Sequence, residues 1–119
     1  MHTGLLLYAH RIEFVLGDAL LILPRLKADV VFLSPPWGGP SYLQKPEFAI
    51  RDIQLAGLDG FQLAQLAQKA APTVVYYLPK TTPASEVAEL AADLNVKSIE
   101  LQSNFLNGKI KAKTAYFSY

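Results

Sequence analysis

The feature that most constrains the fold is a short apolar run that stops at two prolines. Val30 to Leu33 are four apolar residues in succession, and Ser34-Pro35-Pro36 follows directly. An unbroken apolar run of this length is typical of a strand buried on both faces of a parallel sheet. Proline has no backbone N–H and a fixed φ, so the strand must end there. These residues favour an α/β fold.

The remainder of the chain alternates between strand patterns and helix patterns. Strands are predicted at Arg11–Leu16 and Thr73–Leu78, and a closing hairpin at Ile99–Asn104 and Lys113–Tyr119 joined by Asn107-Gly108. Helices are predicted after Gly17-Asp18 and through Leu26, at Phe61–Ala71, and at Glu86–Leu94 with a capping pattern that begins at Ser85. We therefore expect one α/β domain over residues 1–119, with a parallel sheet and an antiparallel edge hairpin.

Composition and charge exclude several classes of protein. With 119 residues, 51% of them hydrophobic and 18% charged, the chain has the composition of one globular domain. Its net charge of +1 excludes a strongly basic coat protein, so any polyanion must be bound by local charges. The absence of cysteine excludes disulfides and thiolate metal sites, and His2 and His10 do not favour a zinc centre. We expect no metal.

No apolar run approaches the length of a membrane span. Met1 to Tyr8 lacks the basic leader and cleavage pattern of a secretion signal. We therefore expect an intracellular protein without a membrane partner.

The candidate site is the loop that follows the apolar run. Ligands of open parallel sheets bind at the carboxyl ends of the strands. Here the loop contains the single tryptophan, Trp37, between the proline pair Pro35-Pro36 and the glycines Gly38 and Gly39. The prolines leave carbonyl oxygens available as acceptors, and the glycines allow close approach of the backbone. A rigid turn whose tryptophan covers the edge of the core is the structural alternative.

Residues 29–40 resemble the signature of the trimethylguanosine synthase family, which methylates the 2-amino group of the 7-methylguanosine cap of small nuclear and nucleolar RNAs. The resemblance continues through Val74–Pro79, Gln102–Lys109 and Thr114–Phe117, so it covers roughly residues 11–119 and leaves residues 1–10 as a divergent start. It implies the C-terminal part of a Rossmann-like class I methyltransferase sheet. It also implies S-adenosylmethionine as cofactor and capped RNA as partner.

The resemblance implies roles for three loop residues. Ser34 and Pro35 would hold the target amine, and their catalytic part would be orientation rather than base catalysis. The ring of Trp37 would stack on the positively charged 7-methylguanine, with a cation–π contribution of about 0.5–2 kcal/mol. Ser34 would also border the cofactor.

Three further residues match family positions. Asp18 would accept a hydrogen bond from the adenine amino group of the cofactor, although a helix N-cap explains it as well. Tyr42 and Lys80 would contact the cap phosphates, although an exposed lysine is usually only solvated. Asn104, Phe105 and Asn107 belong to the resembling blocks, but a strand-to-turn role explains them equally well.

Part of the family pattern is not in this chain. The family orders its strands 3-2-1-4-5-7-6, and its first strand leads into a glycine-rich turn for the cofactor. Met1 to His10 contains only Gly4 and no acidic residue. We expect a truncated domain with little or no activity. Its Val30–Leu33 strand would expose an apolar edge, and reduce stability, unless Met1–Tyr8 or another chain covers it.

Two other functions remain open. The chain could be a non-catalytic cap-binding or interaction module, or a methyltransferase for another nucleobase amine, although Trp-Gly-Gly-Pro argues against the latter. The RNA substrates of the family imply the nucleus or the cytoplasm.

Overall fold

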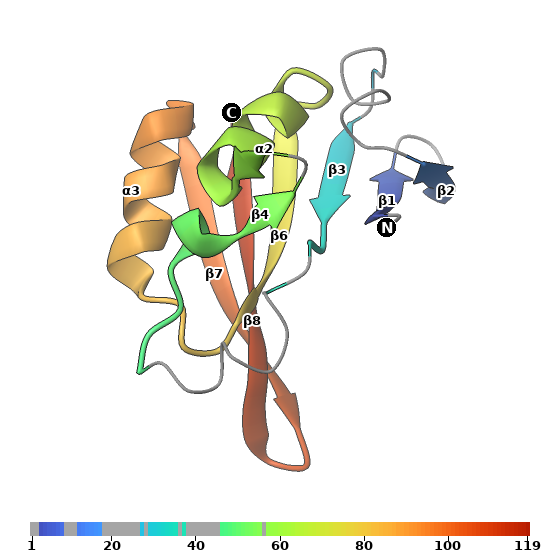
Figure 1. The fold of residues 1–119 in the computed structure, drawn as a ribbon. Helices are drawn as coiled ribbons and strands as arrows, with labels where there is room; N and C mark the ends of the chain where they lie inside the picture. The colour runs from blue at the N-terminus through green and yellow to red at the C-terminus, as the bar shows by residue number, and fades with distance from the viewer. Residues whose placement is uncertain are drawn as a thin grey trace.

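One mixed sheet organises the chain (Figure 1). The computed structural model describes residues 3–8, 12–17, 27, 29–35, 37, 46–55 and 57–119. Six strands form the sheet in the order β2-β1-β3-β6-β8-β7. Their bounds are β1 Thr3–Tyr8, β2 Ile12–Gly17, β3 Val30–Leu33, β6 Thr73–Pro79, β7 Ser98–Leu106 and β8 Lys109–Ser118. The helix predicted through Leu26 lies outside the described residues.

The part of the sheet from β3 to β7 has the expected methyltransferase arrangement. The order β3-β6-β8-β7 reproduces the 4-5-7-6 half of the order that the resemblance implies. β3 and β6 are parallel, and β8 runs antiparallel between β6 and β7. The chain therefore folds as the C-terminal part of a class I methyltransferase sheet with a terminal antiparallel hairpin. The sequence predicted a parallel sheet, but among the described strands only β3 and β6 pair in parallel.

The first strand covers the edge of β3. β1 pairs with β3 antiparallel, with Leu6 opposite Phe32 and Tyr8 opposite Val30. β2 joins the sheet through an antiparallel pairing with β1. Burial of an unpaired strand edge removes donors and acceptors that would otherwise recruit another chain. The conditional expectation that residues up to Tyr8 cover this edge is confirmed.

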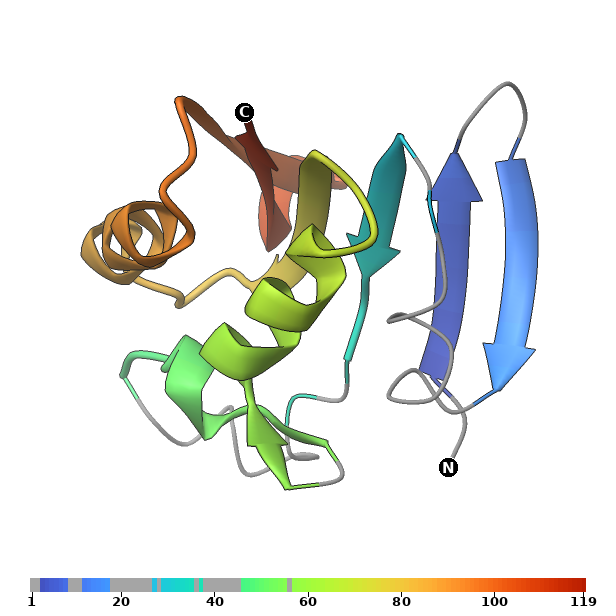
Figure 2. The ribbon, with the colours of Figure 1, turned by 90° about the horizontal axis from the view of Figure 1, so that it is seen from above.

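Two helices lie on the same face of the sheet (Figure 2). They are α2 Gly60–Gln68 and α3 Ala84–Leu94. α2 follows two short paired strands, β4 Gln54–Leu55 and β5 Leu58–Asp59, and Asp59 and Gln62 form a reciprocal capping box at its start. α3 begins after Pro83 without a side-chain cap, so the capping pattern predicted at Ser85 was wrong.

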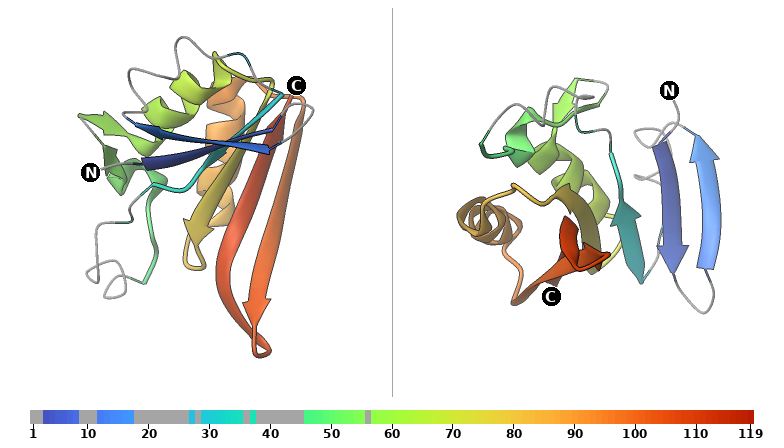
Figure 3. Two further views of the ribbon diagram at one scale, coloured as in Figure 1. Left: turned by 90° about the vertical axis from the view of Figure 1, so that its right-hand side faces the viewer. Right: turned by 90° about the horizontal axis from the view of Figure 1, so that it is seen from below.

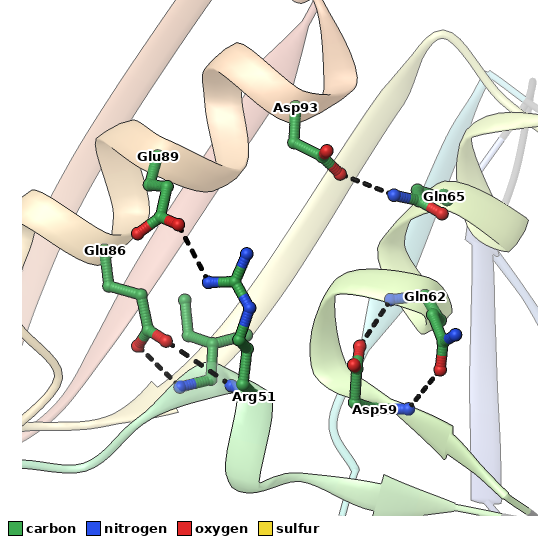
Figure 4. Close-up of polar contacts among 8 residues, drawn as sticks. Arg51, Asp59, Gln62, Gln65, Glu86, Glu89 and Asp93 are labelled. Carbon is green, nitrogen blue, oxygen red and sulfur yellow. Dashed lines mark hydrogen bonds and ion pairs between the residues drawn. The ribbon is translucent and has the colours of Figure 1, made fainter.

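The reason is that Pro83, whose side chain has no oxygen, occupies the N-cap position, and Ser85 lies inside the helix. The Glu86 carboxylate accepts from the backbone N–H groups of Ile50 and Arg51, in the 3₁₀ turn η3 Ile50–Asp52. The Arg51 guanidinium bonds Glu89 at 2.9 Å, and the Gln65 amide donates to Asp93 (Figure 4). These contacts join η3, α2 and α3 into one layer over the sheet.

The core lies between this layer and the sheet. Its largest fully buried side chains include Tyr76, Phe117, Ile50, Leu90 and Val31. The Tyr76 hydroxyl donates to the Gly60 carbonyl at 2.9 Å, and burial raises the pKa of that phenol, so it stays protonated as a donor. Within the described residues, no helix is long and apolar enough to cross a membrane.

Candidate functional site at the carboxyl edge of β3 and β6

The candidate site begins where two parallel strands end together. Leu33, the last residue of β3, pairs with Tyr76 of β6, so both strands run toward one edge of the sheet. Ser34 follows β3 as an exposed residue, and Pro35 is buried. Lys80 follows β6 and is exposed. The topology therefore brings the loop after β3 and the loop after β6 to the same edge, as the parallel pattern predicts.

Trp37 is held against β6. Its indole stacks on the ring of Tyr77 with centroids 5.5 Å apart and planes inclined by 23°. The indole Nε1 donates to the Tyr77 carbonyl oxygen at 3.4 Å. An offset stack together with a hydrogen bond restricts both the position and the tilt of the ring. Trp37 is part-buried, so this edge of the sheet carries an aromatic surface of fixed orientation.

The loop that carries Lys80 is closed by hydrogen bonds. Thr82 is buried and bonds the Pro79 carbonyl through both its N–H and its hydroxyl, at 3.1 and 2.8 Å. The ammonium group of Lys113, on β8, donates to the Thr82 carbonyl at 3.0 Å. The Phe48 N–H donates to the Thr81 carbonyl at 3.2 Å. Lys80 thus projects from a loop that is tied to its own strand, to β8 and to the segment before η3.

One hydroxyl in this loop has no partner. Among the described residues, the Thr81 Oγ1 is the one buried side-chain nitrogen or oxygen atom without a hydrogen-bond partner. An unsatisfied buried hydroxyl is unfavourable by about 1–3 kcal/mol. Thr81 directly follows Lys80 in the sequence.

The Asn-Phe-Leu-Asn block has structural roles. The Thr114 hydroxyl donates to the Asn104 side chain at 2.6 Å, and Thr114 is the register partner of Tyr77. Asn107 and Gly108 have φ values of 53° and 77°, the left-handed conformations of a tight hairpin turn. The strand-to-turn explanation of Asn104 and Asn107 is confirmed.

Four of the predicted site residues lie at this one edge: Ser34, Pro35, Trp37 and Lys80. Asp18 and Tyr42 lie outside the described residues. Sequence reasoning missed the support that Tyr77 and Lys113 provide. The alternation of side chains along residues 73–79 could have indicated Tyr77. Consecutive strand residues point to opposite faces, so Tyr76 and Tyr77 cannot both pack in the same core.

The described residues do not make a complete site for a methyl donor. β1 lies beside β3, and Tyr8 at its end pairs with Val30 at the start of β3. β1 therefore ends at the edge opposite Ser34, and no glycine turn from β1 is available beside Ser34. No group of three or more histidine, cysteine, aspartate or glutamate residues suited to a metal ion occurs in the described part of the chain.

Comparisons with known proteins agree with this topology. Residues 4–119 match the model of a family described as RNA cap guanine-N2 methyltransferase. The chain is 35% identical over 114 residues to the trimethylguanosine synthase of Schizosaccharomyces pombe, covering 91% of this chain and 46% of the relative. It is 30% identical over 66 residues to the trimethylguanosine synthase of Saccharomyces cerevisiae, covering 56% of this chain and 21% of the relative. The chain spans about half the length of the first relative and about a fifth of the second.

Proposed function

Because this chain belongs to the RNA cap guanine-N2 methyltransferase family, we propose that it binds the 7-methylguanosine cap of an RNA and holds guanine N2 for methylation toward trimethylguanosine. Its substrate is a capped small nuclear or nucleolar RNA. The methyl donor is S-adenosylmethionine, which supplies a methyl group bonded to a sulfonium. The chain acts in the nucleus or in the cytoplasm.

The orientation of Trp37 is the observation that carries this proposal. The stack on Tyr77 and the hydrogen bond to its carbonyl hold the indole in position before a ligand arrives. A preorganised ring loses little conformational freedom on binding. The 7-methylguanine ring carries a positive charge, so it gains a cation–π attraction of about 0.5–2 kcal/mol on this face that unmethylated guanine lacks.

Ser34 and Pro35 orient the amine. An exocyclic purine amine is a weak nucleophile, so alignment with the methyl group is the larger part of what these residues contribute. The N–H bonds of the amine can donate to the hydroxyl of Ser34, which is exposed, and to the Pro35 carbonyl. No base is required beside them, since the proton can leave to water after the transfer.

Lys80 and Tyr42 bind the cap phosphates in this proposal. Lys80 is exposed at the end of β6, and its loop is braced by Lys113. An ammonium group near phosphates contributes a charge-assisted hydrogen bond. Ser34, and Asp18 from outside the described residues, border the donor in this proposal.

One observation favours a second candidate function, cap binding without methyl transfer. β1 is antiparallel to β3, so a glycine turn for the donor is not formed beside Ser34 by the described residues. Such a chain would keep the aromatic and cationic cap contacts and lack the donor.

The test is a titration of the folded chain with 7-methylguanosine triphosphate and with GTP, followed through the emission of Trp37. The expected result is saturable quenching by the methylated nucleotide and little by GTP. A folded chain that shows no quenching would contradict cap binding. Incorporation of labelled methyl groups from S-adenosylmethionine into capped RNA then separates the two candidate functions, because a cap-binding module would quench without incorporation.

A further inference from the structure

The β7–β8 hairpin extends beyond the rest of the sheet. Ala112 of β8 pairs with Pro79, the last residue of β6, so the residues of β8 before Ala112 pair with β7 alone. At about 3.3 Å per residue, the hairpin passes the end of β6 by roughly 10 Å. We call residues 105–111 the hairpin tip. Figures 1 and 3 show it projecting from the sheet, and in Figure 1 it lies at the end toward which β3 points.

Large apolar side chains gather on the tip. Phe105, Leu106 and Ile110 are 64%, 56% and 37% exposed. Phe105 lies opposite Ile110, and Leu106 lies opposite Lys109. Consecutive strand residues point to opposite faces, so Phe105 and Leu106 present apolar surface on both sides of the tip. Single exposed apolar residues are ordinary, but Phe105 and its cross-strand partner Ile110 form an exposed apolar pair on one face of a projecting hairpin, which makes this face a candidate binding surface.

The charge around the tip has one sign. Residues 101–119 contain Lys109, Lys111 and Lys113 and no acidic residue, in a chain whose net charge is only +1. Pro79 of β6 pairs with Ala112 of β8. Lys80 directly follows Pro79, and Lys111 directly precedes Ala112. Two lysines therefore flank the place where the hairpin leaves the sheet. A ligand that matches the tip must combine negative charge with flat apolar groups.

The tip is also continuous with the candidate site. Tyr77, which supports Trp37, pairs with Thr114, and Thr114 bonds Asn104. Asn104 lies directly before Phe105, at the point where the register of β7 against β8 shifts, so these contacts end at the base of the tip. A chain that leaves the Trp37 region reaches the tip after crossing two strands.

We propose that the hairpin tip binds single-stranded RNA, with Phe105 stacking on a base and Lys109 and Lys111 contacting phosphates. Sequence-tolerant binding of single strands combines these two elements, aromatic stacking platforms and a cationic path for the backbone. The placement of this RNA next to the cap rests on the proposed function, and the tip then contacts the nucleotides that follow the cap.

The experiment measures binding of a short 3′-labelled oligouridylate, uncapped and capped, to the full chain by fluorescence anisotropy. Phe105→Ala should weaken binding of the uncapped RNA by about five- to a hundredfold. The double variant Lys109→Gln/Lys111→Gln should reduce the slope of log K against log salt by about 1.4, from about 0.7 per phosphate contact. The matched controls Ile99→Ala and Lys97→Gln change exposed residues at the other end of the hairpin and should bind like the unmodified chain.

The outcomes separate this inference from the proposed function. Equal affinity and equal salt slope in the tip variants and the controls would overturn RNA binding by the tip, even if 7-methylguanosine triphosphate still quenches Trp37. If the tip variants lose RNA binding and the unmodified chain does not bind 7-methylguanosine triphosphate, RNA binding by the tip is supported and cap recognition is contradicted. If sedimentation shows that the tip variants instead abolish self-association, the tip is a contact between copies and the inference is wrong.

Discussion

Trp37 and Tyr77 are 40 positions apart in the chain, and their rings stack with centroids 5.5 Å apart. The donor in the accompanying hydrogen bond is the Trp37 indole, and the acceptor is the Tyr77 backbone carbonyl. Truncation of the Tyr77 side chain therefore removes the stack and leaves the acceptor in place. This separation makes the contribution of the stack measurable.

We expect Tyr77→Ala to lower the affinity for 7-methylguanosine triphosphate by about two- to tenfold, since an aromatic pair contributes about 0.5–1.5 kcal/mol beyond its buried area. Isothermal titration calorimetry measures the change. Tyr77→Phe keeps the ring and should bind normally. Tyr116→Ala, on the neighbouring strand β8, is the matched control. Equal losses in Tyr77→Ala and Tyr116→Ala would argue against a specific role of the stack.

Lys80→Gln should reduce the affinity for 7-methylguanosine triphosphate by about tenfold and leave the affinity for the 7-methylguanosine nucleoside unchanged, because the lysine acts on the phosphates. Lys113→Met should produce a smaller loss of the same kind, since its ammonium holds the Thr82 carbonyl of the Lys80 loop. Both ligands are titrated under identical salt. If the nucleoside loses as much affinity as the triphosphate, Lys80 does not act through the phosphates.

Glu86→Gln should destabilise the fold by about 1–3 kcal/mol, because it replaces an acceptor oxygen with a donor beside the backbone N–H groups of Ile50 and Arg51. Glu89→Gln is the matched control. Glu89 pairs with Arg51 where both side chains are at least half exposed, so Glu89→Gln should lower the free energy of unfolding by less than about 1 kcal/mol. Urea unfolding followed by circular dichroism compares the two variants. The reverse order of stability would show that η3 does not depend on Glu86.

Gly60→Ala should destabilise the fold by about 1–3 kcal/mol. A Cβ atom at this position would lie 2.1 Å from the Ile50 carbonyl oxygen and 2.6 Å from its Cγ2, so η3 or the start of α2 must move. Ser85→Ala, in the first turn of α3, changes an exposed position and should leave the melting temperature almost unaltered. An unaltered melting temperature in Gly60→Ala would mean that η3 does not pack closely against the start of α2.

The amino-acid pattern was sufficient to predict most of the sheet and both described helices. The apolar runs at Val30–Leu33 and Thr73–Leu78 correspond to strands β3 and β6. A continuous apolar run favours a strand buried on both faces, whichever strands lie beside it. The Asn107-Gly108 turn was also recognisable, since few residue pairs tolerate two positive φ angles. Local conformational preferences determine such elements.

Local preference did not give the start of α3 correctly. A capping pattern begins at Ser85, yet α3 starts at Ala84, after Pro83, whose side chain cannot cap the helix. For the exposed edge of β3, the sequence predicted coverage either by Met1–Tyr8 or by another chain. The sequence did not decide between them, because strand pairing depends on which strand edges are free in the fold.

By itself, the sequence determined the α/β alternation, the hairpin turn and the residue types at the edge of β3 and β6, because these depend on neighbours in the chain. Tertiary structure alone decided that Tyr77 orients Trp37, that Lys113 braces the Lys80 loop, and that the hairpin tip projects beyond β6. Each of these relationships joins residues from different strands. Their distances depend on sheet order and register, which side-chain periodicity within one segment does not specify.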